Sequence, residues 1–313
     1  MKFEFVSSGS KANIEGALLL QNSVDLYVEE KFDASRYGLE LDMDGKWHAY
    51  SRGGIDRIDN IPYIVDELQL LDLPRGTVLD CEVCVMDPDR TKRWELSRSV
   101  MGTKHYNPEA ERATLLIFDI QHYGDTDLMT ASWLYRRAKI KAIFESSTMI
   151  KNDTYFNTGY VAYTRAWPIT NIADLWHMIV DLGHGEGVMI KSNRIAKYGK
   201  DWNKVKKEHT IDAFIIGTTN GKGKYEGQIG TLEVAVMNGD VIWPIGKVSN
   251  VGDDATRKSM TDMALHGELK NRVIEIKFNE VTKNFKLRHG RFMRWRDDKP
   301  ADECLLEQLE ELR

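Results

Sequence analysis

Residues 28–36 read VEEKFDASR, an extended run in which a lysine lies among acidic residues. With the two-residue period of a β-strand, Glu29, Lys31 and Asp33 point to one side of that strand. A strand buried on both faces does not normally carry such a row of charges. Two interpretations are open: a solvated edge strand with alternating charges, or a reactive lysine on the wall of a cleft.

The composition is that of a globular protein with room for two domains. The chain has 313 residues, of which 42% are hydrophobic and 29% charged, values ordinary for a soluble fold. No apolar run approaches the roughly 18 residues of a membrane helix, and the N-terminal apolar run is too short for a signal peptide. Cys81 and Cys84, three apart on an expected strand, should leave from opposite faces, which disfavours a metal or redox pair. We expect a reduced, cytoplasmic protein of a bacterial or phage-infected cell, away from membranes.

The net charge of −5 hides two basic segments. Segment 194–207 has six Lys or Arg and one Asp, and segment 271–300 has nine Lys or Arg and four acids, so each carries +5. The last thirteen residues carry −4. Two basic segments on an acidic protein indicate a surface for a polyanion.

Two kinds of pattern divide the chain near residue 208. The expected strands of the first part cover 26–32, 38–43, 77–86, 113–120, 186–191 and 202–206, and the expected helices cover 61–71, 132–145 and 171–182. After that point, short apolar runs between Gly, Asn and Asp turns indicate a closed OB-like β-barrel, followed by an amphipathic C-terminal helix. We therefore predict an α+β protein with domains 1–207 and 208–313.

Charged side chains interrupt the apolar strands of the first part. They are Asp80 and Glu82, Glu186 and Lys191, and Lys204 and Lys206. Together with Lys31 they suit a pocket in which lysines hold phosphates and carboxylates hold a divalent metal. Glu186 and Lys191 are five apart and would point oppositely in one ideal strand. Either the strand begins after Glu186 or a twist brings one of the two side chains around, and both alternatives are open.

The order and spacing of these motifs resemble those of ATP-dependent DNA ligases, which share the covalent nucleotidyltransferase superfamily with RNA ligases and mRNA capping enzymes. The motifs are K-x-D-G-x-R at 31–36, S-R-x-G at 51–54, D-x-E at 80–82, F-D at 118–119, E-G-x-x-x-K at 186–191, W-x-K-x-K at 202–206 and R-x-D-K at 296–299. The resemblance covers nearly all of the chain from about residue 26. Ala34 stands where the family usually has Gly, which would add strain of roughly 1 kcal/mol if the position needs a positive φ.

The resemblance implies a nucleotidyltransferase domain of ATP-grasp-like antiparallel sheets with helices, then an OB-fold domain. It implies an enzyme that joins the 3′-hydroxyl and 5′-phosphate at a nick in double-stranded DNA, through lysyl-AMP and then adenylated DNA. The cofactors would be ATP and Mg²⁺, with Mn²⁺ as a substitute, and the chain would act as a monomer of a minimal, virus- or phage-like form.

Residue roles follow from motif positions. Lys31 would carry the AMP, Glu29 would accept from the adenine amino group, and Phe118 would stack on the base. The set expected to bind ATP or AMP is Glu29, Lys31, Arg36, Arg52, Glu82, Phe118, Lys191, Lys204, Lys206, Arg296 and Lys299. Glu82 and Glu186 would hold the metal, or Glu82 would instead bind the ribose hydroxyls. Arg36 and Arg52 would contact ribose or phosphate, and the α-phosphate would be bound by Lys191, Lys204 and Lys206. The set expected to bind DNA is Lys197, Lys200, Arg288, Arg291 and Arg294.

Two further expectations concern reactivity and motion. An attacking amine must be neutral, and neighbouring cations favour that form, so Lys204, Lys206 and a bound metal should activate Lys31. Asp33 should act in the opposite direction, unless it orients the amine or engages the metal. Closure of the second domain would need a hinge in segment 207–214, around Asp212. Two rival functions stay open: an RNA ligase or mRNA-capping-type nucleotidyltransferase, and a non-catalytic OB-fold nucleic-acid binder with a decayed pocket.

Overall fold

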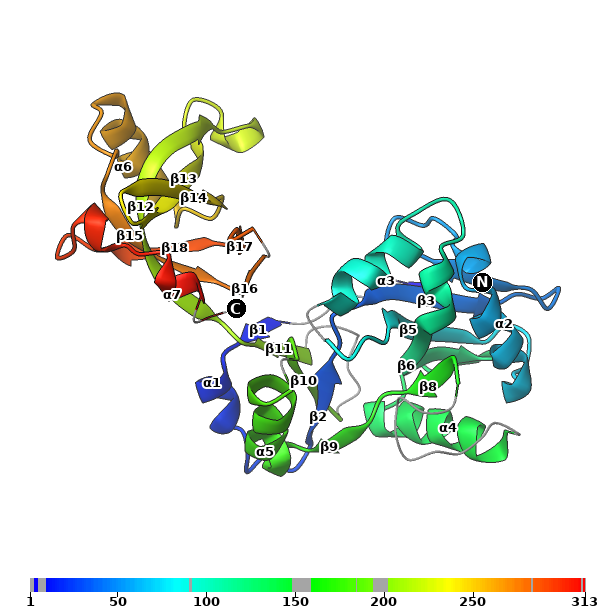
Figure 1. The fold of residues 1–313 in the computed structure, drawn as a ribbon. Helices are drawn as coiled ribbons and strands as arrows, with labels where there is room; N and C mark the ends of the chain where they lie inside the picture. The colour runs from blue at the N-terminus through cyan, green and yellow to red at the C-terminus, as the bar shows by residue number, and fades with distance from the viewer. Residues whose placement is uncertain are drawn as a thin grey trace. The chain divides into compact units, whose positions relative to one another are not determined.

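The computed structural model describes residues 3–4, 10–89, 92–147, 159–183, 185–193, 202–282, 284–310 and 312. The chain separates into two compact units, Met1–Lys206 and Lys207–Arg313, and each is described by itself (Figure 1). Among the described residues, no helix combines the length and apolar character needed to cross a membrane.

The first unit contains two mainly antiparallel sheets. The first sheet has the strand order β1-β11-β10-β2-β9. Its strands are β1 (Ser10–Ala12), β2 (Leu26–Lys31), β9 (Ala166–Pro168), β10 (Gly187–Ser192) and β11 (Trp202–Lys206). Because β10 lies between β2 and β11, Gly187 is opposite both Lys31 and Lys206. This register brings three motifs, far apart in the sequence, to neighbouring strand ends.

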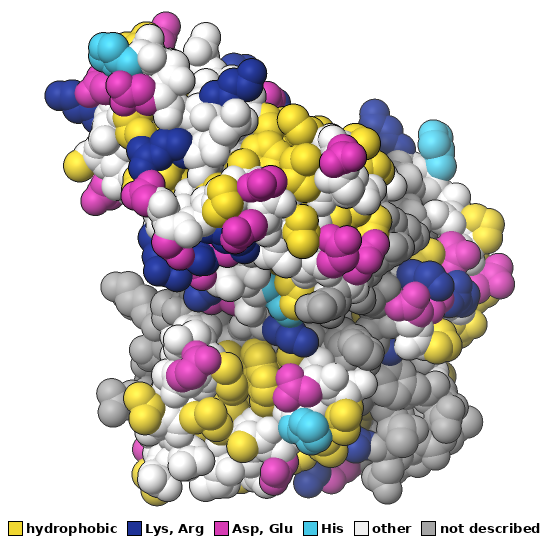
Figure 2. Space-filling view, turned by 60° about the vertical axis from the view of Figure 1, so that its left-hand side comes forward, with side chains coloured by type: hydrophobic (Ala, Val, Ile, Leu, Met, Phe, Trp, Pro, Cys, Tyr) yellow, Lys and Arg dark blue, Asp and Glu magenta, His cyan; other side chains and the backbone are white. Residues whose placement is uncertain are grey.

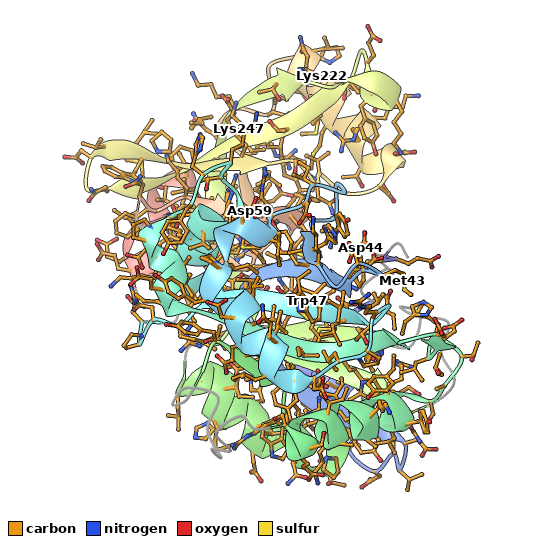
Figure 3. The ribbon with its side chains drawn as sticks, turned by 90° about the vertical axis from the view of Figure 1, so that its right-hand side faces the viewer. Met43, Asp44, Trp47, Asp59, Lys222 and Lys247 are labelled. Carbon is orange, nitrogen blue, oxygen red and sulfur yellow. The ribbon has the colours of Figure 1, made fainter. Side chains whose placement is uncertain are left out.

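The second sheet has the order β4-β3-β5-β6-β7, with β8 pairing in parallel with β6. Its strands are β3 (Ser35–Leu41), β4 (Trp47–Tyr50), β5 (Val78–Val85), β6 (Ala113–Tyr123), β7 (Thr126–Asp127) and β8 (Val161–Tyr163). Met43 and Asp44 lie in the turn between β3 and β4 (Figure 3). Arg36 pairs with Glu82, and Asp80 with Asp119, so the charged motifs of three strands lie side by side.

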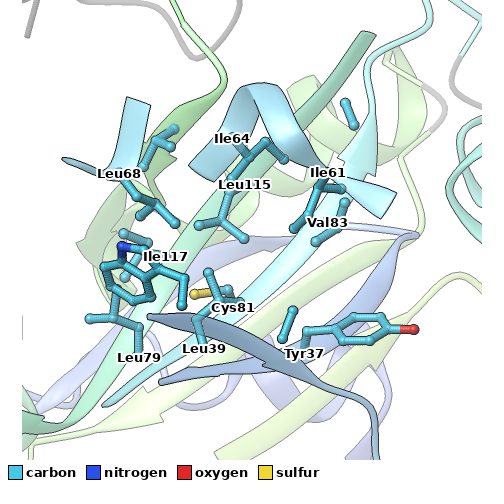
Figure 4. Close-up of a cluster of buried hydrophobic side chains, with 14 of the residues drawn as sticks. Tyr37, Leu39, Ile61, Ile64, Leu68, Leu79, Cys81, Val83, Leu115 and Ile117 are labelled. Atoms are coloured by element: carbon cyan, nitrogen blue, oxygen red, sulfur yellow. The ribbon is translucent and has the colours of Figure 1, made fainter. Parts of the chain in front are cut away.

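Helices cover the apolar face of this second sheet. The helical segments of the unit are α1 (Ile14–Leu18), η1 (Ile58–Asn60), α2 (Pro62–Leu68), η2 (Gln69–Leu71), α3 (Arg93–Met101), η4 (Pro108–Arg112), α4 (Trp133–Ser146), η5 (Ile169–Asn171), α5 (Ile172–Trp176) and the π-helical turn η6 (His177–Asp181). Ile64 and Leu68 of α2 pack on Leu79, Cys81 and Leu115 (Figure 4). Apolar side chains on alternate strand positions thus leave the opposite face of the sheet for charged residues.

The cysteine pair of β5 follows the pleat as expected. Cys81 packs in the large core cluster, whereas Cys84 packs with Phe32 and Leu116 in a separate cluster. Both are buried free thiols, and they leave from opposite faces of one strand.

The second unit is a closed five-stranded barrel. The strand order is β14-β13-β12-β15-β18, and a bridge between Asn250 and Arg291 joins the two ends of that order (Figure 1). The strands are β12 (His209–Asn220), β13 (Ile229–Asn238), β14 (Val241–Val248), β15 (Val273–Phe278) and β18 (Arg291–Trp295), with a small hairpin of β16 (Glu280–Val281) and β17 (Leu287–Arg288). The remaining segments are η7 (Gly223–Tyr225), α6 (Asp254–Leu265), η8 (Ala301–Glu303) and α7 (Glu307–Glu310). The predicted barrel is confirmed.

The expected C-terminal helix is much shorter than its leucine pattern suggested. Met237 donates to the carbonyl of Cys304, and Leu306 donates to the carbonyl of Met237, so β13 holds residues 304–306 in an extended form. Helix α7 therefore spans only four residues. Tertiary hydrogen bonds override the local pattern here.

The expected hinge residue lies within a strand. Asp212 belongs to β12 and pairs with Glu275 of β15. Between the end of β11 and the start of β12 only Lys207 and Glu208 are left.

Candidate active site

A cavity of about 240 Å³ lies between the two sheets of the first unit. Strands β2, β10 and β11 line one side of it, and β3, β5 and β6 line the other. The lining residues are Glu29, Glu30, Lys31, Phe32, Ala34, Arg36, Arg52, Glu82, Phe118, Thr164, Met189, Lys191, Trp202 and Lys204. Lys31 therefore lies on the wall of a cavity and not on a solvated edge strand, whereas its reactivity stays a prediction.

The structure brings most of the predicted site residues together here. Eight of the eleven residues expected to bind ATP or AMP line the cavity: Glu29, Lys31, Arg36, Arg52, Glu82, Phe118, Lys191 and Lys204. Two more predicted residues adjoin Lys31: Glu186 forms an ion pair with Lys31, and Lys206 forms an ion pair with Glu186. Arg296 and Lys299 belong to the second unit. Lys197 and Lys200 lie outside the described residues.

The Lys31 cluster, formed by Lys31, Glu186 and Lys206, marks one end of the cavity. The carboxylate of Glu186 accepts one hydrogen bond from each of the two lysine ammonium groups. Lys31 and Glu186 are each 18% exposed and Lys206 is 25% exposed. Burial raises the pKa of Glu186, but the two lysines outweigh it, and the pKa is lowered.

The expectation that cations around Lys31 favour its neutral form is wrong for the ligand-free protein. Burial lowers the pKa of Lys31, but the carboxylates of Glu186, Glu82 and Asp33 outweigh it and raise the pKa. The physical reason is that Glu186 lies between the two lysines. Lys204 is different: burial, followed by the charges of Lys31 and Lys206, lowers its pKa.

A second carboxylate faces Lys31 from the opposite sheet. Burial raises the pKa of Glu82 to about 7, against the opposing charges of Lys31 and Arg36. Its Oε2 atom is buried and has no hydrogen-bond partner among the described residues. Arg36 is instead bound in a two-pronged pair by Asp80, at 2.9 and 2.6 Å. Burial raises the pKa of Asp80 to about 6 despite this pair.

The Glu29 cluster, formed by Glu29, Lys191, Arg137 and Thr164, marks the other end. Lys191 Nζ lies 2.6 Å from Glu29 Oε2, and Arg137 Nη1 lies 3.2 Å from Glu29 Oε1. Lys191 and Glu29 are each only 2% exposed. Burial lowers the pKa of Lys191, although Glu29 opposes it. The structure thus places Lys191 against Glu29 and away from the Lys31 cluster.

Aromatic rings surround this buried pair. Lys191 Nζ lies 4.2 Å from the ring centre of Trp202 and 4.9 Å from that of Phe118. Arg36 lies over the Phe118 ring, at 5.5 Å. Phe118 lines the cavity although it is only 9% exposed.

Two backbone positions explain how the strands approach one another. Gly187 has a φ of 153°, and a Cβ there would lie 2.1 Å from the carbonyl oxygen of Val205, so only glycine fits beside β11. Strand β10 begins at Gly187, which frees Glu186 to turn toward Lys31. Ala34 is not among the described residues with positive φ, so the alanine carries no strain of that kind.

The sequence reasoning missed Arg137 and Thr164. Arg137 Nη1 lies 3.0 Å from Thr164 Oγ1, and Arg137 Nη2 donates to the Thr164 carbonyl. The adjacent Arg136 is 1% exposed and forms a two-pronged pair with Asp119, at 2.7 and 3.0 Å. Two arginines in the otherwise core-facing pattern of 132–145 were the available signal, because buried guanidinium groups need carboxylate partners.

The second unit holds its predicted cations in ion pairs. Asp212 pairs with both Arg296 and Lys299, at 2.7 and 3.1 Å. Of the residues expected to bind DNA, Arg288 pairs with Glu280, Arg291 with Glu208, and Arg294 with Glu275. On the face shown in Figure 2, Lys and Arg side chains lie among Asp and Glu side chains. In the described part of segment 271–300, the basic residues are therefore mixed with acids in space.

Comparisons with known proteins agree with this arrangement. Residues 8–206 match the family model of the ATP dependent DNA ligase domain, and residues 220–296 match that of the DNA ligase OB-like domain. A DNA ligase of Methanospirillum hungatei is 26% identical, and one of Archaeoglobus fulgidus is 28% identical. In both cases 91% of this chain aligns with 54% of the relative, so the chain spans about half the length of these curated relatives.

Solved structures share the fold. One, from a structure-function analysis of Lig E DNA ligases, has a TM-score of 0.66 at 18% identity. The match covers 94% of this chain and all of that one. At this level of identity the similarity concerns the fold alone.

Proposed function

This chain belongs to the ATP-dependent DNA ligase family, and we propose that it seals nicks in duplex DNA through a nucleotide carried on Lys31. The observation that carries the proposal is the cavity itself. It collects the lysines, carboxylates and aromatic ring of six sequence motifs on two facing sheets.

Lys31 is the nucleophile of this proposal. Lys31 first releases its ammonium proton to solvent. The neutral Nζ atom then forms a bond to the α-phosphorus of ATP, the bond from that phosphorus to the pyrophosphate oxygen breaks, and the attacking nitrogen passes a proton to Glu186. Glu186 already accepts a hydrogen bond from that amine and is the closest carboxylate. AMP then passes to the 5′-phosphate at the nick, and the 3′-hydroxyl displaces it to form the phosphodiester.

Cations around the Lys31 cluster supply the electrostatics of the transfer. Lys204 lines the cavity, and Lys206 lies beside Glu186. Both are placed to compensate the negative charge of the phosphate oxygens while the bond to Lys31 forms and the bond to pyrophosphate breaks. Lys191 is less well placed to compensate this charge in the ligand-free arrangement, because it is already paired with Glu29.

The residues also fit a divalent metal. The buried Oε2 atom of Glu82 has no hydrogen-bond partner among the described residues and is available to a cation, and Glu186 supplies the second carboxyl group. Hard cations such as Mg²⁺ or Mn²⁺ prefer oxygen ligands of this kind. A bound cation would offset the negative charge of the carboxylates around Lys31 and stabilise the phosphate oxygens. Glu82 and Glu186 are the residues that would hold it.

At the other end, Glu29 and Phe118 would recognise the base. A carboxylate that accepts from Lys191 and Arg137 offers only acceptor oxygens to a ligand, which suits the amino group of adenine. Phe118, which lines the cavity, would stack on the ring system. We further propose that Arg296 and Lys299 reach the ATP phosphates from the second unit, and that the chain acts as a cytoplasmic monomer.

Intact-mass spectrometry tests the proposal. Protein stripped of AMP and given ATP and Mg²⁺ should gain the mass of one AMP, and nicked duplex DNA should then remove it and be sealed. The Lys31→Ala variant, folded as judged by circular dichroism, should gain nothing. An active-site lysine that never carries a nucleotide in folded wild-type protein would overturn the assignment.

Parallel samples separate the rival functions. Labelling with GTP alone would point to a capping-type enzyme, and sealing of nicked RNA but not DNA would point to an RNA ligase. Sealing of a DNA nick rejects a non-catalytic binder.

A further inference from the structure

We infer that Arg137 of α4 is a positioning residue that sets the preference of this site for adenine over guanine, an inference that rests on the proposed function. Arg137 does not line the cavity. It acts through two residues that do, Glu29 on β2 and Thr164 between β8 and β9.

Arg137 links two residues that line the cavity, Glu29 and Thr164, by hydrogen bonds. One nitrogen, Nη1, lies 3.2 Å from Glu29 Oε1 and 3.0 Å from Thr164 Oγ1. The other, Nη2, donates to the Thr164 carbonyl. The planar guanidinium makes these bonds at once, which a lysine at this position would not reproduce.

Packing against aromatic rings fixes the position of the Arg137 side chain. The guanidinium lies 5.7 Å from the ring centre of Trp133 and 5.5 Å from that of Tyr163, and the side chain is only 13% exposed. Thr164 is held from the other side, because its backbone N–H donates to the Ile117 carbonyl at 3.0 Å. Glu29 therefore has little freedom to rotate.

This rigidity has a consequence for the choice of base. Adenine presents an amino group at the position where guanine presents a carbonyl oxygen. A carboxylate fixed by Lys191 on one oxygen and Arg137 on the other can accept from the amino group but faces the carbonyl with like polarity. A buried polar mismatch of this kind discriminates strongly between ligands. Without Arg137, the carboxylate can turn toward Lys191 and lose that orientation.

A competition assay tests the inference. AMP-stripped protein is given equal ATP and GTP with Mg²⁺, and intact-mass spectrometry measures the ratio of AMP to GMP adducts, which differ by one oxygen atom. The ratio is read within one sample, so a lower folded fraction does not change it. Arg137→Met should lower the ratio by about tenfold, as expected for one lost charged hydrogen bond, and should raise KM for ATP more than it lowers kcat. Arg137→Lys should recover part of the loss.

The matched control is Lys141→Met, which removes a cation from the same helix. Lys141 is 62% exposed and pairs only with Glu145 among the described residues at 3.6 Å, so its ratio should equal that of wild type. An Arg137→Met protein that forms adducts at the wild-type ratio overturns the inference. If that variant cannot be recovered, Arg137→Gln replaces it. A wild-type ratio of AMP to GMP adducts in Arg137→Gln would equally overturn the inference. A wild-type protein without any adduct would instead reject the proposed function.

Discussion

The two ends of the cavity hold the same chemical group in different ways. In each, one carboxylate lies between two cations: Glu29 between Lys191 and Arg137, and Glu186 between Lys31 and Lys206. The difference is exposure. Glu29 and Lys191 are 2% exposed, whereas the members of the Lys31 cluster are 18 to 25% exposed.

Exposure decides what each cluster can do. A fully buried pair cannot exchange partners with water, and breaking it leaves an uncompensated charge. A partly exposed pair is held weakly and can exchange its partners for phosphate or metal. The Glu29 cluster is therefore suited to recognise a base with a fixed geometry, and the Lys31 cluster is suited to react.

The largest expected effect is on stability, at the buried end. Lys191→Met should lower the free energy of unfolding by about 3 kcal/mol, because Glu29 would keep only Arg137 as a cationic partner. Methionine fits among the surrounding rings, so loss of packing adds little. Urea unfolding followed by tryptophan fluorescence measures this value.

The matched control at the exposed end is Lys206→Met, which should cost no more than about 1 kcal/mol. Equal costs for the two variants would break the comparison, since they would show that burial does not distinguish the clusters.

At the Lys31 cluster, we expect a substitution to lower the rate of adduct formation and not the free energy of unfolding. Glu186→Gln keeps the size of the side chain but removes the charge shared by Lys31 and Lys206. We expect adduct formation to slow about a hundredfold, the scale of one lost electrostatic contact in a transition state. The midpoint of urea unfolding should move little. A wild-type rate in quenched-flow measurements would remove Glu186 from the reacting machinery.

Most of this site could be predicted from the sequence, partly because period-two alternation shows which side of a strand a charge occupies. Arg52, Phe118 and Lys191 were predicted only from the resemblance of their motifs to those of DNA ligases. Glu29 and Lys31, and likewise Lys204, needed only the pleat to be placed toward one cavity. The barrel was equally readable, since its turns carry Gly and Asn between short apolar runs.

What the sequence did not show depends on contacts between distant segments. Arg137 is 108 residues from Glu29, and no local pattern links a helical arginine to a strand glutamate. The pairing of residues 304–306 with β13, which shortens the last helix, is likewise non-local. The charge of Lys31 was misjudged for the same reason, because the position of Glu186 relative to two lysines is set by the register of three strands.

A pH experiment on Glu82, which faces Lys31, sharpens the comparison. Burial raises the pKa of Glu82 to about 7 from an ordinary value of 4.5. Between these values the folded protein keeps a proton that the unfolded chain has lost, so the free energy of unfolding falls as pH rises through this window. Glu82→Gln should remove about 2 kcal/mol of that decline between pH 5 and pH 8.

The control for this measurement is Glu15→Gln, at an exposed position of α1. It should leave the pH dependence of urea unfolding as in wild type. If Glu82→Gln does the same, Glu82 is ionised in the folded protein at neutral pH, and burial has not neutralised it.

The smallest expected effect lies at a pair with an exposed arginine in the second unit. Arg294 is 65% exposed beside Glu275 in the second unit, and loss of such a pair costs at most about 1 kcal/mol of stability. If the pair opens for DNA, Arg294→Ala should weaken binding to nicked duplex and reduce the slope of log affinity against log salt by about one. Lys141→Ala, which removes an exposed cation of α4, should leave the slope unchanged. An unchanged slope for Arg294→Ala would mean that Glu275 keeps the arginine from phosphate, and that even an exposed ion pair on this barrel is as closed to exchange as the buried one at Glu29.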